Sequence, residues 1–278
     1  MRIDAHQHFW GLERGDYGWL TPDLDPIYRD FFPDDLAPFL TAQGIEGTIL
    51  VQAAPTIAET RWLLALAKRA PFIKGVVGWV DFGAPDAAKT INDLARNEYL
   101  VGLRPMIQDI ADDEWMLGNV LTPAFQTVAS ANLVFDALTL PRHLQNLRIL
   151  LHRHPDLNVV IDHGAKPKIA EGCISAWARD MQLLAEETSA KVKLSGLVTE
   201  AGANWTSDML RPYVDHLLNT FGPARMIWGS DWPVCTLAST YDRWCETTQS
   251  LLSGLSESDL AAIMGRNAIE TYNLKPAE

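Results

Sequence analysis

The sequence predicts a (β/α)8 barrel, an α/β fold in which eight parallel strands alternate with eight helical segments. Three observations point to it. Short β-rich runs recur along all 278 residues, longer segments with helical apolar spacing separate them, and polar residues stand at the ends of many predicted strands. The rival is an open doubly wound sheet, but no predicted strand is followed by a glycine-rich phosphate-binding turn. We therefore expect one barrel domain over residues 1–278.

The predicted elements follow from the periodicity of apolar residues. The strands are expected at 2–6, 47–52, 73–80, 99–104, 132–137, 158–163, 191–195 and 225–229. Helices are expected at 34–43, 57–70, 85–97, 123–131, 141–154, 171–189 and 205–221, with a last helical region at 241–272. Proline, Asp, Thr or Ser often begins these segments, as helix N-termini prefer. The stretch 9–33 has no clear period, and its length and aromatic content indicate an ordered loop that covers a site.

Composition and charge narrow the class of protein. The formal net charge is −12 and no cluster of Lys and Arg stands out, which excludes a general nucleic-acid partner. No run approaches the roughly 18 apolar residues of a membrane span. The chain begins with a strand-like segment in place of a basic and apolar leader, so we expect a cytoplasmic protein with its three cysteines reduced. The oligomeric state stays open.

The opening "MRIDAHQHFW" holds two histidines, His6 and His8, one residue apart. Alternate side chains of a strand face the same side, so the two imidazoles point together near the strand end. Two imidazoles at this spacing can bind one metal ion. Taken alone, the pair fits a metal site and an ordinary strand end equally well.

Two further strands end in polar residues. Strand six ends in "VVIDHGAKP", where a regular strand turns Asp162 and His163 to opposite sides; we expect His163, the better ligand type, to face the barrel. A lone histidine there would more often be structural. Strand eight ends in "MIWGSDWPV", where Pro233 forbids further ladder bonding and places Asp231 at the mouth. The alternative is a turn aspartate that bonds its own backbone.

A barrel brings the ends of strands one, six and eight to one rim, and so brings His6, His8, His163 and Asp231 together. Three neutral imidazoles and a carboxylate suit Zn²⁺, or equally a proton-transfer site without metal. Arg104 ends strand four. It could act as a fixed cation facing a carbonyl or carboxylate, or pair with a structural acid at the rim.

A further group of residues is predicted to form a wall for a polyhydroxylated ring. Gln52 and Trp79 end strands two and three, Lys193 and Ser195 share one side of strand seven, and Trp10 follows the histidine pair. Amides and hydroxyls can bond sugar hydroxyl groups, and indole faces pack on C–H surfaces. For both tryptophans, packing in the core is an equally good reading.

Five motifs together resemble the amidohydrolase superfamily, in its branch of sugar-lactone hydrolases: "DAHQH", "VGLRP", "DHGAKP", "GSDWPV" and the final "GRNAIETYNL". The resemblance covers nearly the whole chain. It implies that His6, His8, His163 and Asp231 line the site and hold one divalent cation, with Zn²⁺ the first choice. Arg104 stands where many members have a metal-bridging lysine or a glutamate, and strand five, "LVFDALTL", has no histidine. Both departures argue against a binuclear centre, and the need for any metal stays open.

The resemblance also implies the reaction, which is hydrolysis of a sugar lactone such as L-fucono- or L-rhamnonolactone to the aldonic acid. Asp231 would be the general base on water and then the acid on the ring oxygen, with His163 and Arg104 binding the developing oxyanion. The closest rival is a metal-dependent decarboxylase of the same superfamily, which usually brings a strand-five histidine where Asp136 lies here. A catalytically silent sugar-binding barrel is the alternative from another class.

Overall fold

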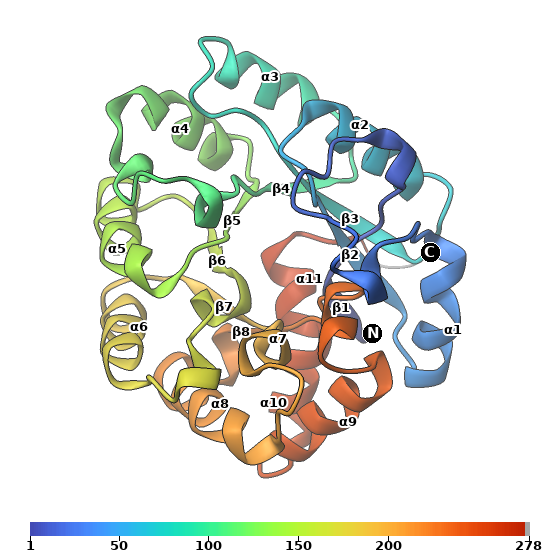
Figure 1. The fold of residues 1–278 in the computed structure, drawn as a ribbon. Coiled ribbons are helices and arrows are strands. Elements are labelled where there is room, and N and C mark those ends of the chain that lie inside the picture. The colour runs from blue at the N-terminus through green and yellow to red at the C-terminus, as the bar shows by residue number, and fades with distance from the viewer. Residues whose placement is uncertain (276–278) are drawn as a thin grey trace.

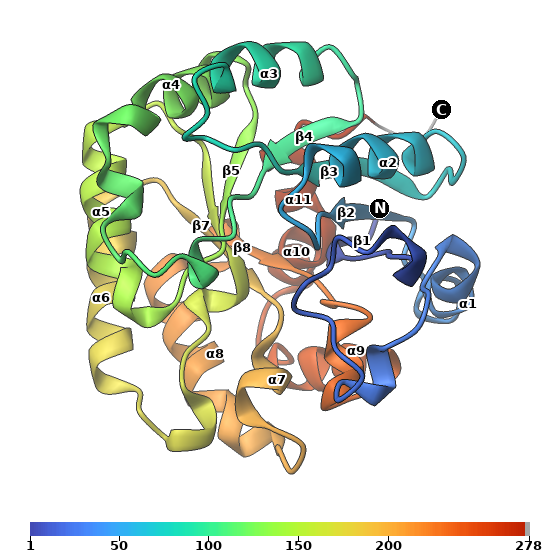
Figure 2. The same ribbon diagram turned by 45° about the horizontal axis from the view of Figure 1, so that its top comes forward.

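The computed structural model describes residues 1–275 and shows eight parallel strands in chain order, with the helices around them (Figures 1 and 2). The strands are β1 (Ile3–Gln7), β2 (Gly47–Val51), β3 (Ile73–Gly78), β4 (Leu100–Leu103), β5 (Val134–Ala137), β6 (Val159–Ile161), β7 (Lys191–Leu194) and β8 (Met226–Trp228). The ends of β1 and β8 meet through a parallel bridge between Gln7 and Trp232. The N–H of His8 donates to Trp232 O at 2.7 Å, and the N–H of Asp231 to His6 O at 2.8 Å. The predicted (β/α)8 barrel is confirmed.

The helices lie on the outside of the strands, as Figure 1 shows. They are α1 (Pro33–Gln43), α2 (Ile57–Ala67), α3 (Ala87–Leu94), α4 (Thr122–Ser130), α5 (Leu144–Arg153), α6 (Ser175–Glu187), α7 (Leu197–Ala201), α8 (Ser207–Phe221), α9 (Tyr241–Leu251), α10 (Glu257–Ala261) and α11 (Asn267–Thr271). The predicted region 241–272 is broken at residues 252–256, and a π-helical turn, Ala262–Arg266, joins α10 to α11. The short α7 was not predicted, because five residues are too few to show a helical period.

Most strands end earlier than the apolar runs suggested. The run 73–80 ends as a strand at Gly78, and 158–163 ends at Ile161. The residues beyond these ends are the start of the loops at the barrel mouth, which is where the sites of (β/α)8 enzymes lie.

The barrel interior has an apolar layer, closed at one end by residues from the C-terminal part of the chain. Its side chains are Ile3, Ala5, Ile49, Val51, Val77, Val101, Val134, Val160 and Ile227, with Ala268, Tyr272 and Leu274 beneath them. A larger apolar cluster fills the space between strands and helices. These layers support the polar residues at the other end of the strands.

The loop 9–33 is held over the mouth by aromatic packing. The backbones of Trp10 and Phe31 exchange two hydrogen bonds of 3.1 and 2.9 Å, and the Trp10 indole N–H donates to Arg29 O at 2.8 Å. Phe31 also meets the Trp232 ring edge-on, at 5.1 Å between centroids. This segment is therefore fastened to the barrel at the point where β8 ends. Within residues 1–275, no helix has the length and apolar character needed to cross a membrane.

Candidate active site

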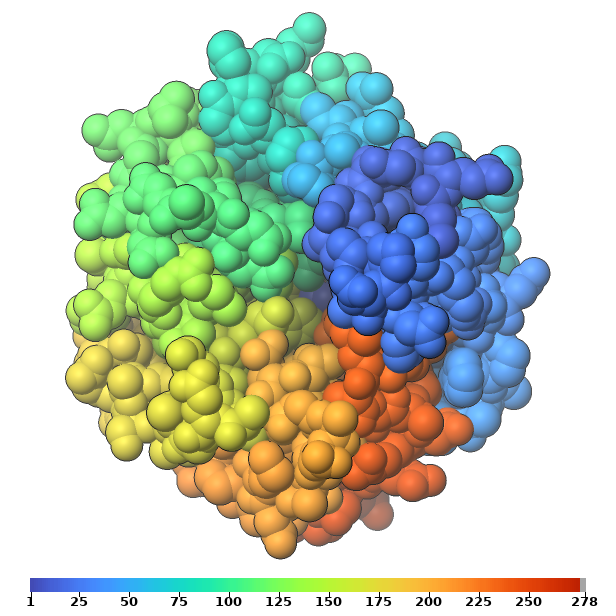
Figure 3. All heavy atoms as spheres, viewed as in Figure 1, coloured from blue at the N-terminus to red at the C-terminus, as the bar shows by residue number. Residues whose placement is uncertain are grey.

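A cavity of about 270 Å³ opens at the carboxyl ends of the strands. Figure 3 shows the hollow at the centre of this face, bordered by the N-terminal segment in blue, the green loop after β4 and the orange C-terminal segment. Its wall includes four of the predicted site residues, His8, Arg104, His163 and Asp231. The structure thus brings side chains from β1, β4, β6 and β8 into one cavity.

The Asp231 carboxylate is the centre of the predicted ligand set. Its Oδ1 lies 3.3 Å from His8 Nε2, 3.7 Å from His6 Nε2 and 3.9 Å from His163 Nε2. Two of the rings are oriented from behind: His8 Nδ1 lies 2.8 Å from Val51 O, and His163 Nδ1 lies 2.9 Å from the Ser195 hydroxyl. These contacts turn the Nε2 atoms toward Asp231.

The backbone after β6 corrects one sequence-based expectation. Asp162 and His163 were expected on opposite sides of a regular strand, but the strand ends at Ile161 and a 3-10 turn follows. His163 adopts φ 54°, in the left-handed region that non-glycine residues rarely use. Both side chains consequently reach the site, Asp162 Oδ1 lying 3.4 Å from His6 Nδ1. Asp231 also has a left-handed φ, of 59°, and such backbone strain is typical of functional sites.

Two glycines make room for the histidines. A Cβ on Gly229 would lie 2.7 Å from His6 Cβ, and a Cβ on Gly196 would lie 2.6 Å from His163 Nδ1. Gly196 also has a positive φ of 65°. Only glycine fits at these two positions without displacing His6 or His163.

Burial and close contacts determine the protonation states of the site residues His6, His163 and Asp231. Desolvation lowers the pKa of His163 to about 4 and that of His6 well below its usual value, so both rings are neutral at neutral pH. Burial alone would raise the pKa of Asp231, but the neighbouring His163 and His8 side chains outweigh it and hold the pKa below its usual range. The site therefore presents an ionised carboxylate beside the neutral rings of His6 and His163.

Arg104 is paired with an acid at the barrel rim, which is one of the two roles that the sequence left open. One guanidinium nitrogen, Nη2, contacts the backbone oxygen of Gln52 and lies 3.0 Å from Gln52 Oε1. The other, Nη1, lies 3.4 Å from Asp162 Oδ2 and 3.3 Å from His6 Nε2. The side chain also forms part of the cavity wall. Arg104 is thus a cation paired with an acid and fixed beside the ligand cluster.

The predicted sugar-binding wall is placed differently. Gln52, Lys193 and Ser195 are fully buried, and their side chains contact other site residues, not the cavity. Trp10 is fully buried in the aromatic packing of the 9–33 loop. Trp79 lines a neighbouring hollow. For Gln52, Lys193 and Ser195 the reason is that strand alternation shows which side a residue faces but not how deep in the barrel it lies.

Side chains from the loops form the wall instead. Lys166 Nζ lies 3.1 Å from Gln108 Oε1 and 3.3 Å from Glu200 Oε1, which joins the loops after β4 and β6 to α7 around the rim. Trp19, from the 9–33 loop, adds an indole whose N–H donates to Ala53 O at 2.7 Å. Of these residues, the sequence pointed only to Lys166, as part of "DHGAKP", and to the loop that carries Trp19.

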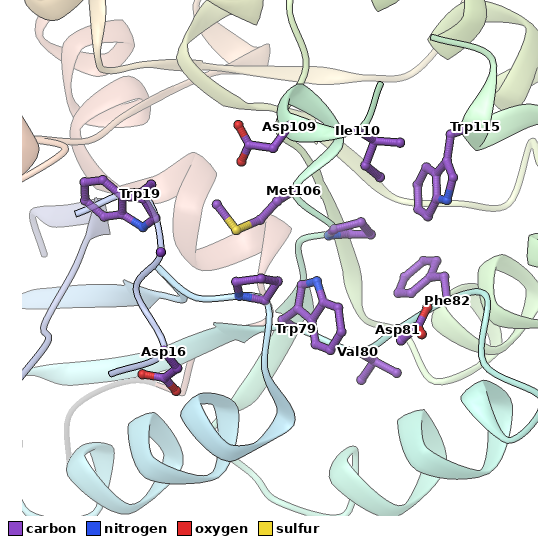
Figure 4. Close-up of a pocket in the computed structure, with 13 residues that line it drawn as sticks. Asp16, Trp19, Trp79, Val80, Asp81, Phe82, Met106, Asp109, Ile110 and Trp115 are labelled. Atoms are coloured by element: carbon purple, nitrogen blue, oxygen red, sulfur yellow. The ribbon is translucent and has the colours of Figure 1, made fainter. Parts of the chain in front are cut away.

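A larger hollow of about 550 Å³ adjoins the cavity and shares Trp19, Met106 and Asp109 with it. Figure 4 shows Trp79 and Trp115 on the opposite side of this hollow from Trp19, with Met106 between Trp19 and Trp79. The lining is mainly aromatic and apolar. The mouth of the barrel thus continues into a region that offers indole faces.

The donor set fits a divalent cation. Four tetrahedral ligands at about 2.1 Å from a zinc ion are about 3.4 Å from one another, and the three Asp231-to-imidazole separations of 3.3, 3.7 and 3.9 Å are close to this value. His6, His163 and Asp231 each offer one ligand atom, all within 4.8 Å of one another. Neutral imidazoles and an ionised carboxylate are also the protonation states that metal binding requires.

The fold, the site and the comparisons with known proteins together place the protein among the (β/α)8-barrel hydrolases. More specifically, the chain belongs to the amidohydrolase family, whose model matches residues 3–274. The chain is 46% identical over 282 residues to an L-fucono-1,5-lactonase of Burkholderia ambifaria, a match that covers 99% of this chain and 96% of that one. It is 35% identical over 299 residues to an L-fucono-1,5-lactonase of Burkholderia multivorans, covering 100% and 98% of the two chains.

A solved structure extends the comparison to the fold. An amidohydrolase from Burkholderia multivorans, determined with bound zinc, superimposes with a TM-score of 0.94 at 34% identity and covers 99% of this chain and 100% of that one. The family resemblance stated from the motifs is confirmed by these comparisons.

Proposed function

We propose that this protein hydrolyses a sugar lactone to the aldonic acid, with L-fucono-1,5-lactone as the first substrate to test. The observation that carries the proposal is the ionised Asp231 carboxylate in a cavity with three imidazoles and Arg104. The likeness to two L-fucono-1,5-lactonases supports the choice of lactone. No observation favours the decarboxylase reading, and Asp136, at the strand-five position, is bound to Lys193.

Opening a lactone requires an activated water, a polarised carbonyl and a proton for the leaving ring oxygen. In the proposed mechanism, Asp231 accepts a proton from the attacking water and returns it to the ring oxygen. Its lowered pKa keeps it ionised and ready to accept that proton at neutral pH. Arg104 shares the cavity wall with His163 and stabilises the negative charge that develops on the carbonyl oxygen; His163 takes part in this when no metal is bound.

We assign a divalent cation, with Zn²⁺ the first choice, to His6, His8, His163 and Asp231. When bound, such an ion lowers the pKa of a water and polarises a carbonyl. The contacts from Val51 and Ser195 would hold the imidazoles in place for it, as outer-shell partners do at metal sites generally.

Substrate selection is assigned to the loop residues of the cavity wall. Gln108, Lys166 and Glu200 offer an amide, an ammonium and a carboxylate, which can bond the hydroxyl groups of a sugar ring. Trp19 offers an indole face for its C–H surface. In this proposal these groups take the place of the fully buried Gln52, Trp10, Lys193 and Ser195, while Trp79, in the adjoining hollow, keeps its predicted role.

The first experiment is a pH-indicator assay of acid release from a panel of aldonolactones, with the purified protein and its Asp231→Asn variant. Loss of a general base typically costs about 10²–10⁴-fold in rate, and we expect kcat to fall by that factor. Asp93→Asn, on the exposed face of α3, is the matched control and should keep full activity. Equal kcat in Asp231→Asn and the parent would remove Asp231 from its role.

The metal assignment is tested separately by chelation. Activity should disappear when the bound metal is removed and return when Zn²⁺ is added. Full activity in a protein that elemental analysis shows to be metal-free would contradict the metal assignment and leave the carboxylate mechanism standing. Acid release from none of the lactones would contradict the proposed function itself.

A further inference from the structure

Beneath the cavity lies a second group of charged side chains that the proposed reaction does not use. Lys193, on β7, is fully buried. Its Nζ lies 2.5 Å from Asp136 Oδ2, 3.0 Å from Asp162 Oδ1 and 3.1 Å from His6 Nδ1. Asp136, Asp162 and His6 are fully buried as well. An ammonium group is rarely buried unless such partners compensate for its lost hydration.

The group is closed on the side away from the cavity. The Tyr272 hydroxyl donates to Asp136 Oδ1 at 2.8 Å, and Lys193 Nζ lies 5.4 Å from the centre of the Tyr272 ring. Tyr272 belongs to the apolar layer at the bottom of the barrel. The charged group is therefore a separate layer between that apolar layer and the cavity.

The three partners of Lys193 have the composition of a metal site. His6, Asp136 and Asp162 each offer one ligand atom, and all three atoms lie within 4.8 Å of one another. One imidazole nitrogen and two carboxylate oxygens are ligands that divalent first-row cations accept. Lys193 Nζ is within 3.1 Å of each of these ligands, which puts the ammonium where an ion would have to be.

The geometry assigns Lys193 the role of an internal cation: its ammonium occupies a cation site formed by His6, Asp136 and Asp162, and so excludes a second metal ion from the barrel. Two buried carboxylates need a positive charge close by. The ammonium group of Lys193 provides this positive charge whether or not metal ions are available. Arg104, 3.4 Å from Asp162 Oδ2, contributes from the cavity side only.

Lys193 is by the same contacts a positioning residue for His6. Lys193 and Asp162 face His6 Nδ1, at 3.1 and 3.4 Å, while His6 Nε2 faces Asp231 at 3.7 Å. The His6 ring thus contacts the charged layer through Nδ1 and the cavity residue Asp231 through Nε2. Because Lys193 and Asp162 contact His6 at Nδ1, on the side away from the cavity, Nε2 of the same ring points toward the cavity.

The test is the metal content of Lys193→Ala. Removing the side chain leaves the three ligands together and opens space for an ion, so we expect the variant to bind one more equivalent of Zn²⁺ per chain than the parent. Elemental analysis after equilibration with Zn²⁺ and removal of the free ion measures this. Zn²⁺ should also raise the unfolding temperature of Lys193→Ala by more than that of the parent.

Two controls isolate the effect. Lys191→Ala removes a lysine from the same strand, two residues earlier, and should keep the parental stoichiometry. Lys193→Ala combined with Asp136→Asn removes one positive charge, one negative charge and one ligand, and should also bind no additional ion. If Lys193→Ala only removed packing and opened no ion site, the single and the double variant would bind the same amount of metal.

A folded Lys193→Ala variant with parental metal content, and no added stabilisation by Zn²⁺, would overturn the assignment. So would a single variant that stays unfolded even when produced with Zn²⁺ while the double variant folds, because the vacated position would then be shown not to accept an ion. The readout is bound metal, so it does not depend on whether the protein is a lactonase.

Discussion

Gly229→Ala is the sharpest test of how the site is built. A Cβ at this position would lie 2.7 Å from His6 Cβ, 3.0 Å from His6 N and 3.3 Å from His6 Cα. Carbon atoms in contact are normally about 3.5–4.0 Å apart, so the new methyl group is about 1 Å too close. Two of the three opposing atoms are backbone atoms of β1, and a change of side-chain rotamer cannot move them away. The strand that carries His6 must shift instead.

The size of the effect follows from that displacement. Overpacking a core costs typically about 1–3 kcal/mol. For 278 residues at about 2.1 cal/mol/K each, this corresponds to a fall in Tm of about 2–5 °C. Activity should suffer more than stability, because a misplacement of about 1 Å at a reacting centre can cost on the order of 10²-fold in rate.

The assay is kcat/KM for lactone hydrolysis beside a thermal unfolding curve. Gly254→Ala is the matched control, since no atom lies within 4 Å of its added Cβ, and both its activity and its Tm should stay at the parental values. A Gly229→Ala enzyme with kcat/KM within threefold of the parent would refute the claim that His6 must sit against β8 for the site to work.

Two further predictions concern groups behind the site. Ser195→Ala removes the hydroxyl 2.9 Å from His163 Nδ1, and loss of such an outer-shell partner should lower Zn²⁺ affinity or activity about 10–100-fold; unchanged values in a metal titration would contradict it. Burial raises the pKa of Glu59 to about 7 from 4.5, against hydrogen bonds from the N–H groups of Ala53 and Ala54. Because the pKa of Glu59 is higher in the folded than in the unfolded protein, protonated Glu59 contributes to the free energy of unfolding. This contribution, roughly 3 kcal/mol, is fully present below pH 4.5 and is lost as the pH rises through 7. Urea unfolding from pH 4.5 to 8 should show that decline in the parent relative to Glu59→Gln, and parallel curves would argue against it.

The barrel and most of its elements could be predicted from local patterns. Apolar runs of four to eight residues marked all the strands, and residues at their ends marked His8, His163 and Asp231 as neighbours. This works because the chain order of a (β/α)8 barrel is also its order in space, so a residue at the end of a strand is placed at the mouth without further information.

The rest depended on depth and on backbone conformation. Side-chain alternation assumes a regular strand, and it failed at Asp162 because β6 ends at Ile161 and the chain turns left-handed at His163. Alternation also does not show how deep in the barrel a side chain lies. Lys193 was therefore expected at the wall of the cavity, but it lies beneath the cavity, between two carboxylates.

The sequence by itself was enough to determine the family, the barrel and the residue types of the upper ligand set, because these are properties of local patterns and chain order. The tertiary structure was needed to show that His6 belongs to two layers, that Lys193 lies among His6, Asp136 and Asp162, and that loop residues such as Trp19 and Lys166 form the cavity wall. The physical reason is that pairing between charges and the shape of a cavity depend on distances between residues far apart in the chain, and no local period carries those distances.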